Sequence, residues 1–161
     1  MSASAADGFI ALVAAEITAV RAFVALLNDE TGVLRGNDAG ALERITAAKE
    51  KLAGELEELG KKRSAFFAAI GLTQNAAAVN NWLASQPPAF AEAWRELMRL
   101  AEIARELNLA NGQCIALLSR DTRIRLAALT GREESAYAPK GQAASSFSSP
   151  SATGFRIRDN A

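Results

Sequence analysis

Few residues of this chain could take part in chemistry. Its 161 residues include no histidine, which is the commonest general base and the commonest protein ligand of metal ions. The single cysteine, Cys114, falls on an apolar helical stripe, so we expect a buried, inert thiol rather than a nucleophile. One cysteine also excludes an intrachain disulfide and fits a reducing compartment.

The carboxylates do not suggest an acid–base pair. Glu57 and Glu58 are adjacent, so on a helix they point in different directions. Glu133 and Glu134 lie in a polar linker, and neither pair has an apolar surrounding that would raise a pKa. Phosphate-binding loops, paired-cysteine motifs and metalloprotease motifs are missing as well. We therefore predict a protein that is not an enzyme and that needs neither a cofactor nor a metal ion.

The composition favours an all-α protein that binds other proteins. Half of the residues are apolar but only 6% are aromatic, which is typical of an alanine-rich helical chain. Basic and acidic residues number 18 each, so no overall field attracts nucleic acid or an anionic membrane. The stretch 9–27 is apolar, but Glu16 and Arg21 would each cost about 3 kcal/mol near a bilayer centre. We expect no stable membrane insertion.

One long helix, from Pro88 to about Leu129, is the element around which the rest is arranged. Proline suits the first turn of a helix, and Thr130-Gly131 suits its end. At 1.5 Å per residue such a helix spans roughly 60 Å. A compact domain of this size has a radius of gyration of only about 15 Å, so the sequence predicts an elongated molecule.

The apolar stripe of this helix is interrupted. Its first half consists of Phe90, Trp94, Leu97, Ala101, Ala104 and Leu107, and its second half of Cys114, Ile115, Leu118, Thr122, Leu126 and Leu129. Between them lies Asn108–Gly112, a polar patch that we expect to be flexible, and the sequence leaves open whether the helix stays straight, bends at Asn111-Gly112 or folds back there. The second half needs a cover of its own. It either caps the rest of the bundle or offers itself to a partner helix.

Two earlier helices are predicted to form an antiparallel hairpin. Heptad patterns run from about Gly8 to Arg35 and from about Asp38 to Ile70, with Gly36-Asn37-Asp38 between them. Lys49 and Arg63 interrupt the second pattern, and we expect their charges to reach out to solvent. The first helix carries a second stripe of small apolar residues, so it is either central in the bundle or shared with a partner.

The remaining segments are short. A helix is predicted over about 75–84, and its Trp82 is expected to pack with Trp94 around the turn at Pro87-Pro88. Residues 132–161 are rich in serine, alanine, glycine and proline and have no sustained period. We predict an elongated antiparallel helical bundle, a coiled-coil hairpin with a long C-terminal helix, over residues 1–131. A flexible tail over 132–161 completes the chain.

Three stretches carry a resemblance to a known family. The hairpin turn reads LRGNDAGALERITAAKEKLAGELEELGKKR, the long helix contains NLANGQCIALLSRDTRIRLAALTG, and the tail contains YAPKG. Their order and spacing resemble the FlgN family of flagellar type III export chaperones over roughly residues 8–142. The resemblance implies a cytoplasmic, helical, non-enzymatic chaperone.

The resemblance also implies partners and residues. FlgN-type chaperones bind the C-terminal helical segments of the hook-filament junction proteins FlgK and FlgL, prevent their premature assembly and deliver them to the export gate. Carried over to this chain, substrate binding falls on Ile115, Leu118, Thr122, Arg125, Leu126 and Leu129. Docking on the cytoplasmic domain of the export gate falls on Tyr137. The alternative function is that of a self-associating structural or adaptor bundle, such as a homodimer built on the two-sided first helix.

Overall fold

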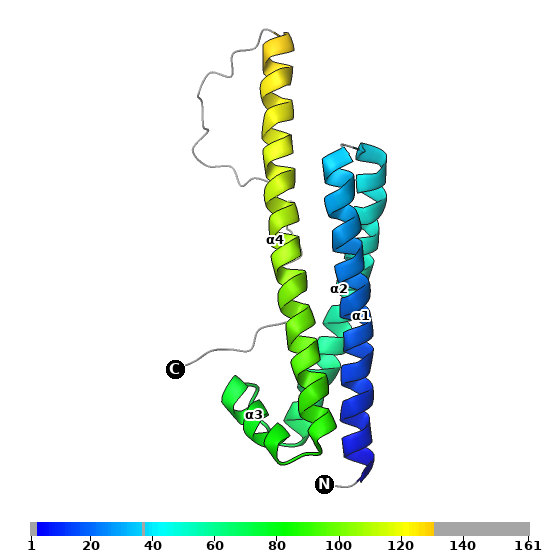
Figure 1. The fold of residues 1–161 in the computed structure, drawn as a ribbon, viewed down its shortest axis with the longest axis vertical. Coiled ribbons are helices and arrows are strands. Elements are labelled where there is room, and N and C mark those ends of the chain that lie inside the picture. Colours follow the sequence, from blue (N-terminus) through cyan, green and yellow to red (C-terminus); the bar gives the residue numbers. More distant parts are fainter. Residues whose placement is uncertain (1–2, 37, 131–161) are drawn as a thin grey trace.

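The computed structural model describes residues 3–36 and 38–130, and these residues form four helices (Figure 1). Helix α1 (Ala3–Gly36) and helix α2 (Ala39–Ala69) make an antiparallel hairpin. The short α3 (Ala76–Ala84) lies at the base of the molecule, and α4 (Pro88–Thr130) runs back along the hairpin, parallel to α1. The prediction of an elongated all-α bundle with a long last helix is confirmed.

The helix boundaries follow from side-chain caps and from glycine. The Oδ1 atom of Asp38 accepts a hydrogen bond from the backbone N–H of Ala41 at 2.9 Å and starts α2. Asn75 caps α3 in the same way, through the N–H of Ala78 at 2.8 Å. Gly71 has a φ of 70° just beyond the end of α2, a conformation that residues with a Cβ rarely adopt.

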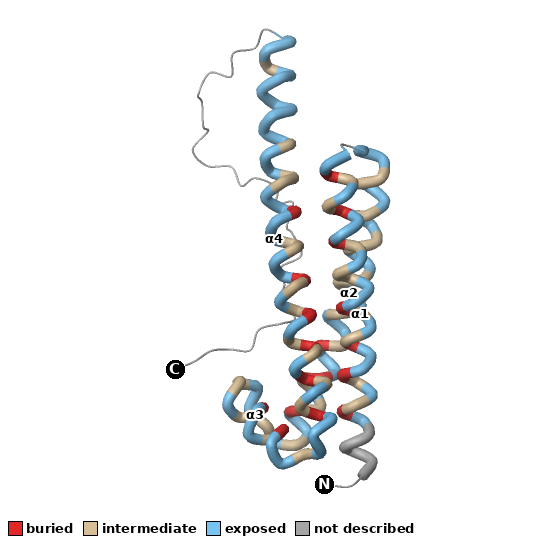
Figure 2. Tube along the Cα trace, in the orientation of Figure 1, coloured by how far each residue is buried: buried red, intermediate tan, exposed pale blue. Residues whose placement is uncertain are grey.

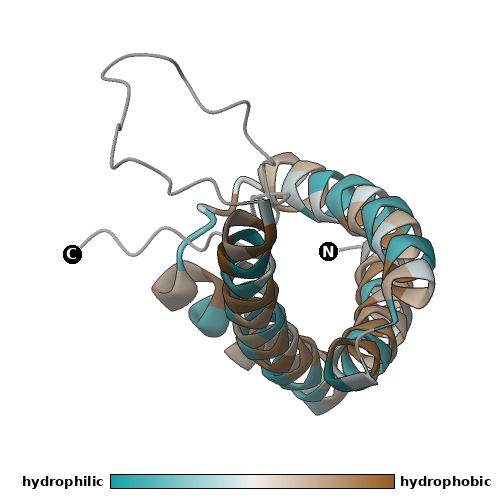
Figure 3. Cartoon of the chain, turned by 90° about the horizontal axis from the view of Figure 1, so that it is seen from above, coloured by the Kyte–Doolittle hydropathy of each residue, from teal (hydrophilic) through white to brown (hydrophobic). Residues whose placement is uncertain are grey.

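Helix α1 is the centre of the bundle. It packs along α2 on one side and along α4 on another, which confirms the more central of its two expected positions. Its buried apolar side chains are Phe9, Val13, Val20, Leu27 and Leu34. Viewed from the end that carries the α1–α2 turn, hydrophilic and hydrophobic residues interleave around each helix (Figure 3).

An aromatic cluster closes the base of the bundle. Phe9 has no exposed surface; its ring stacks on that of Phe90 at 5.4 Å and meets Trp82 edge-on at 4.9 Å. Trp82 and Trp94 both pack against Phe9 and Phe67, so two phenylalanines connect the two tryptophans across the turn. Aromatic pairs contribute about 0.5–1.5 kcal/mol each beyond the area they bury.

The two cations that interrupt the α2 heptads do not reach solvent, and the expectation that they would is wrong. The Nη1 atom of Arg63 donates to both oxygens of Glu16 at 2.7 and 2.6 Å, and Nζ of Lys49 donates to both oxygens of Glu30 at 2.9 and 2.8 Å. Glu16 and Glu30 are only 2% and 1% exposed. A buried carboxylate is costly unless it is paired, so each cation turns inward to its partner.

The two ion pairs share one register. Glu16 and Glu30 are fourteen residues apart on α1, and Lys49 and Arg63 are fourteen residues apart on α2. Fourteen residues are two heptads, so both pairs occupy equivalent places in the antiparallel hairpin. A slip of the hairpin by one turn would leave two buried carboxylates without their cations.

Helix α1 also has the length and composition of a membrane-crossing helix over Gly8–Gly36. The core helix of a soluble bundle passes the same test. Here the buried face of α1 is covered by α2 and α4, and it carries the ion-paired Glu16 and Glu30.

Removal of Arg63 should destabilise the bundle in a pH-dependent manner. Burial raises the pKa of Glu16 above its ordinary value, although Arg63 lowers it. The folded state therefore holds the Glu16 proton more tightly than the unfolded chain. This contribution to stability is fully present below the ordinary pKa of about 4.5 and is lost as the pH rises through the raised value.

In Arg63→Met the carboxylate loses its cation, and we expect the free energy of unfolding at neutral pH to fall by about 3–5 kcal/mol. The deficit should shrink under mildly acidic conditions, as Glu16 takes up a proton. Urea denaturation at both pH values measures this, with the exposed neighbour Lys62→Met as control, for which a change within about 0.5 kcal/mol is expected. Equal losses in the two variants would contradict the assignment.

Candidate partner-binding site

Helix α4 is longer than the hairpin that could cover it. The stacked rings of Phe9 and Phe90 set α1 and α4 level near the base. From that level α1 runs about 40 Å to Gly36 and α4 about 60 Å to Thr130, at 1.5 Å per residue. About 20 Å of α4 therefore projects past the α1–α2 turn (Figure 1). We call residues 112–130 the α4 arm; it comprises this projecting end and the turns of α4 that lie beside the hairpin tip.

Burial along α4 ends where the arm begins. Phe90, Trp94, Leu97, Leu100 and Ala104 are buried, whereas the arm is half-buried at most (Figure 2). The last buried residue is Asn111, which is 3% exposed. The predicted apolar stripe is thus confirmed in its first half, and its second half does not fold back on the bundle.

A polar contact, which we call the Asn111 clasp, joins α4 to α1 at this boundary. The Nδ2 atom of Asn111 donates to the backbone oxygen of Leu27 and to Oε2 of Glu30, both at 2.8 Å. Its Oδ1 atom accepts from the hydroxyl of Thr31 at 2.8 Å. The polar patch that we expected to be flexible is therefore an anchor, and α4 continues unbroken through Gly112.

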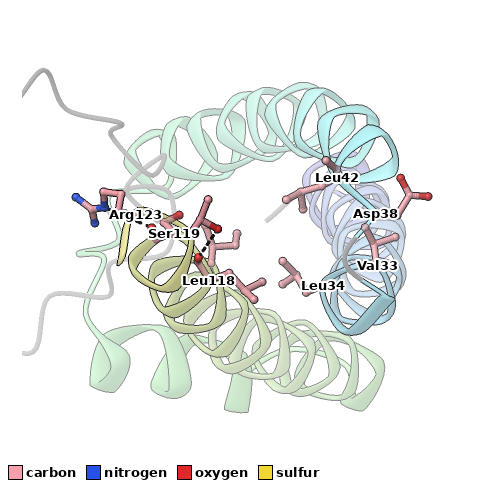
Figure 4. A pocket seen from close by; sticks show the side chains of 10 residues that line it. Val33, Leu34, Asp38, Leu42, Leu118, Ser119 and Arg123 are labelled. Carbon is pink, nitrogen blue, oxygen red and sulfur yellow. Dashed lines mark hydrogen bonds between the residues drawn. The ribbon is translucent and has the colours of Figure 1, made fainter. Parts of the chain in front are cut away.

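Above the clasp, the arm and the tip of the hairpin enclose an open cleft with a volume of about 360 Å³. Its apolar lining comes from both sides, with Val33, Leu34 and Leu42 on the hairpin and Ile115 and Leu118 on the arm. In Figure 4 the side chains of Leu34 and Leu42 on the hairpin and of Leu118 on the arm lie between the two walls, and Arg123 and Asp38 stand at opposite margins.

The predicted substrate-binding residues differ in position. Ile115 and Leu118 are half-buried and line the cleft, and exposed Thr122 lines it too. Leu126 and Leu129 are 58% and 86% exposed. Arg125 is exposed and pairs with Asp121 at 2.8 Å. The structure thus gathers the first three at the cleft and leaves the others on the projecting end.

Cys114 is half-buried, so the expectation of a fully buried thiol is wrong, because the hairpin covers this part of α4 incompletely. Tyr137, like the whole predicted tail, lies outside the described residues.

Sequence reasoning missed several exposed apolar residues. Leu117 and Ile124 are 66% and 58% exposed, seven residues apart, and neither lines the cleft. Their heptad spacing was a signal for a second apolar face. The hairpin wall of the cleft, Val33 and Leu42, carried no such signal, because helical periodicity does not show where a neighbouring helix leaves the bundle.

The site is suited to binding rather than to reaction chemistry. Within residues 3–36 and 38–130, no three acidic, cysteine or histidine side chains gather as a metal ion would require. The cleft lining is mostly aliphatic, with serine and threonine hydroxyls and one charged group at each margin. Such a surface offers apolar contact area with a polar rim, which is what an amphipathic helix needs.

Comparisons with known proteins agree with this fold. The family model described as FlgN protein matches residues 1–145. The fold is similar to the crystal structure of a Pseudomonas aeruginosa protein described as a flagella synthesis protein FlgN, with a TM-score of 0.61 and 20% sequence identity. That match covers 78% of this chain and 97% of the other. No curated protein matches the sequence significantly.

Loss of the Asn111 clasp should increase the local flexibility of α4 where the arm begins. We expect Asn111→Ala to lower the free energy of unfolding by about 1–3 kcal/mol, because it removes buried hydrogen bonds to Glu30 and to the backbone of Leu27. Amide hydrogen exchange should accelerate around residues 107–115 more than at the aromatic base. The half-buried Asn108→Ala, on the same helix, is the matched control. Identical exchange in the two variants would show that the clasp does not hold the arm.

Proposed function

Because this chain belongs to the FlgN family of flagellar export chaperones, we propose that it binds the C-terminal helical segments of the hook-filament junction proteins FlgK and FlgL. In this proposal it keeps these segments from assembling too early and delivers them to the cytoplasmic domain of the export gate. It acts in the cytoplasm and without catalysis, in keeping with a family of chaperones rather than enzymes.

The observation that carries the proposal is the uncovered apolar surface of the α4 arm. Leu126 and Leu129 are 58% and 86% exposed on an intact helix, and they continue the apolar stripe of Ile115 and Leu118 beyond the cleft. Contiguous apolar surface of this kind usually marks an interaction site on a soluble protein. Burial of one such side chain against a partner contributes about 1.5–3 kcal/mol.

A helical partner segment suits this surface in energetic terms. A segment that is disordered alone and helical when bound loses conformational entropy on docking, so the affinity stays moderate and release stays possible. The sequence contains no phosphate-binding loop that would couple release to nucleotide hydrolysis. We therefore attribute release to competition at the export gate.

The alternative function, a self-associating structural or adaptor bundle, would place a second copy on the same exposed surfaces. Helix α1 has a side on which Ala15 and Ala22 are exposed and Leu12 and Leu26 are half-buried. The small side chains of Ala15 and Ala22 would allow close approach of a second helix. The oligomeric state, measured alongside partner capture, separates the two functions.

The introduction of a negative charge at one leucine of the arm should weaken capture of the partner. We expect Leu126→Asp to weaken binding of FlgK and FlgL fragments that end in their native C-termini at least about tenfold, because a charge replaces a buried apolar contact. Leu109→Asp is a closely matched control, since Leu109 lies on the same helix and is 55% exposed, against 58% for Leu126. Co-purification followed by calorimetric titration gives the affinities.

Three outcomes are informative in this experiment. Loss of binding in Leu126→Asp alone supports the chaperone function and the arm as its site. Equal loss in both variants would indicate that the effect is not local to the arm. Absence of binding by a wild-type protein that runs as a stable dimer would favour the self-associating function instead.

The tail tyrosine should act on the other partner only. We expect Tyr137→Ala to weaken binding to the isolated cytoplasmic domain of the export gate at least about tenfold, since tyrosines are frequent anchors of interfaces. Capture of FlgK and FlgL fragments should be unchanged. Phe147→Ala, a second aromatic residue of the tail, is the control. A gate affinity that is insensitive to Tyr137 would remove this residue from the docking site.

A further inference from the structure

The arm is only one wall of the cleft, and the other wall belongs to the hairpin tip. Resting on the proposed function, we propose that the partner helix inserts between these two walls. We further propose that acidic residues flank the apolar stripe of this helix on the side that faces α4. The hairpin residues Val33, Leu34 and Leu42 would then be part of the binding site.

The geometry supports insertion over attachment to the arm alone. Val33 and Leu42 are half-buried on the hairpin, opposite Leu118 on the arm (Figure 4), and Ile115 of the arm lines the same cleft. A helix in the cleft buries apolar side chains on two sides at once, whereas a helix on the outer face of α4 buries one side only. The Asn111 clasp lies one turn below Ile115 and holds α4 at the foot of the cleft.

The charge of the cleft indicates an acidic partner. Nε of Arg123, at one margin, donates only to the backbone oxygen of Ser119, at 3.3 Å. Neither Arg120 nor Arg123 forms an ion pair within the described part of the chain, whereas Arg125 pairs with Asp121. At the opposite margin Asp38 already caps α2, where the positive end of the helix dipole stabilises its carboxylate. Among the described residues that line the cleft, the charge without an ion-pair partner or a helix cap is therefore positive.

This charge argues against the two occupants that the chain itself could supply. The arm of a second copy would bring three arginines against one aspartate, and this net positive charge would repel Arg123. In the C-terminal segment, Phe155 and Ile157 alternate with Arg156 and Arg158, so its apolar residues are flanked by positive charge as well. A different chain with acidic flanks fits better on electrostatic grounds.

Cysteine labelling tests which surface the partner covers. In a Cys114→Ala background of the full chain, Val33→Cys reports on the cleft and Leu117→Cys reports on the outer face of the arm. With the FlgK fragment at ten times its Kd, we expect maleimide to label the Val33→Cys protein about tenfold more slowly, because only the free protein reacts. The Leu117→Cys protein should label at an unchanged rate. A bound fragment that does not protect the Val33→Cys protein would overturn the inference, while the chaperone function would stand.

A pair of designed helical peptides tests the charge and does not depend on the junction proteins. Both carry the same leucine stripe, flanked by glutamates in one and by lysines in the other. We expect the glutamate peptide to protect the Val33→Cys protein at lower concentration and Arg123→Glu to reverse the preference. Arg95→Glu is the matched control, since Nε of Arg95 also donates to a carbonyl of its own helix, at 3.2 Å, far from the cleft.

The outcomes separate the two proposals. If the glutamate peptide protects the Val33→Cys protein and the FlgK and FlgL fragments do not bind, the cleft remains the proposed site for an acidic helix, and FlgK and FlgL are excluded as its partners. Equal protection by both peptides would contradict the proposal that the partner helix carries acidic residues. If the Val33→Cys protein is already protected without a ligand, the occupant is a second copy when the chain is dimeric. It is the chain's own C-terminal segment when deletion of residues 131–161 restores labelling. Either result would overturn the inference.

Discussion

The length of α4 relative to the hairpin is the constraint from which the rest of this molecule follows. Both begin level at the aromatic base, but α4 continues for about 20 Å beyond the α1–α2 turn. A single helix in water loses little by keeping polar side chains exposed, but this one keeps leucines there. The excess length therefore presents apolar surface that the chain cannot cover with the helices described.

The projecting arm is useful only if its root is rigid, and buried polar contacts provide that rigidity. Glu30 accepts from Lys49 of α2 and from Asn111 of α4, so one carboxylate on the central helix joins all three long helices. Fourteen residues away, Glu16 and Arg63 repeat the hairpin contact near the aromatic base. Buried ion pairs add little net stability compared with apolar packing, but a shifted register would leave their charges unpaired. Their value here is to specify one alignment.

Much of the fold was predictable because it depends on local rules. Residues close together in the sequence set each of these features: the helix caps at Asp38 and Asn75, the proline that begins α4 and the heptads of the hairpin. The predictions for Lys49, Arg63 and Asn111 failed for a common reason. Each was judged as a polar residue on its own helix, whereas its partner lies 19, 47 or 81 residues away. The matching fourteen-residue spacings of carboxylates on α1 and cations on α2 were the available signal.

By itself, the sequence determined that the protein is all-helical, about where its helices begin and end, and that the apolar stripe of α4 is interrupted and its second half needs a cover of its own. These properties depend on periodicity and on caps, which act within a few residues. Only the tertiary structure decided which way the buried charges point, where α4 leaves the bundle and that the hairpin tip forms the second wall of the cleft. Those properties depend on partners that lie on other helices and on the relative lengths and positions of the helices, and no single helix contains that information.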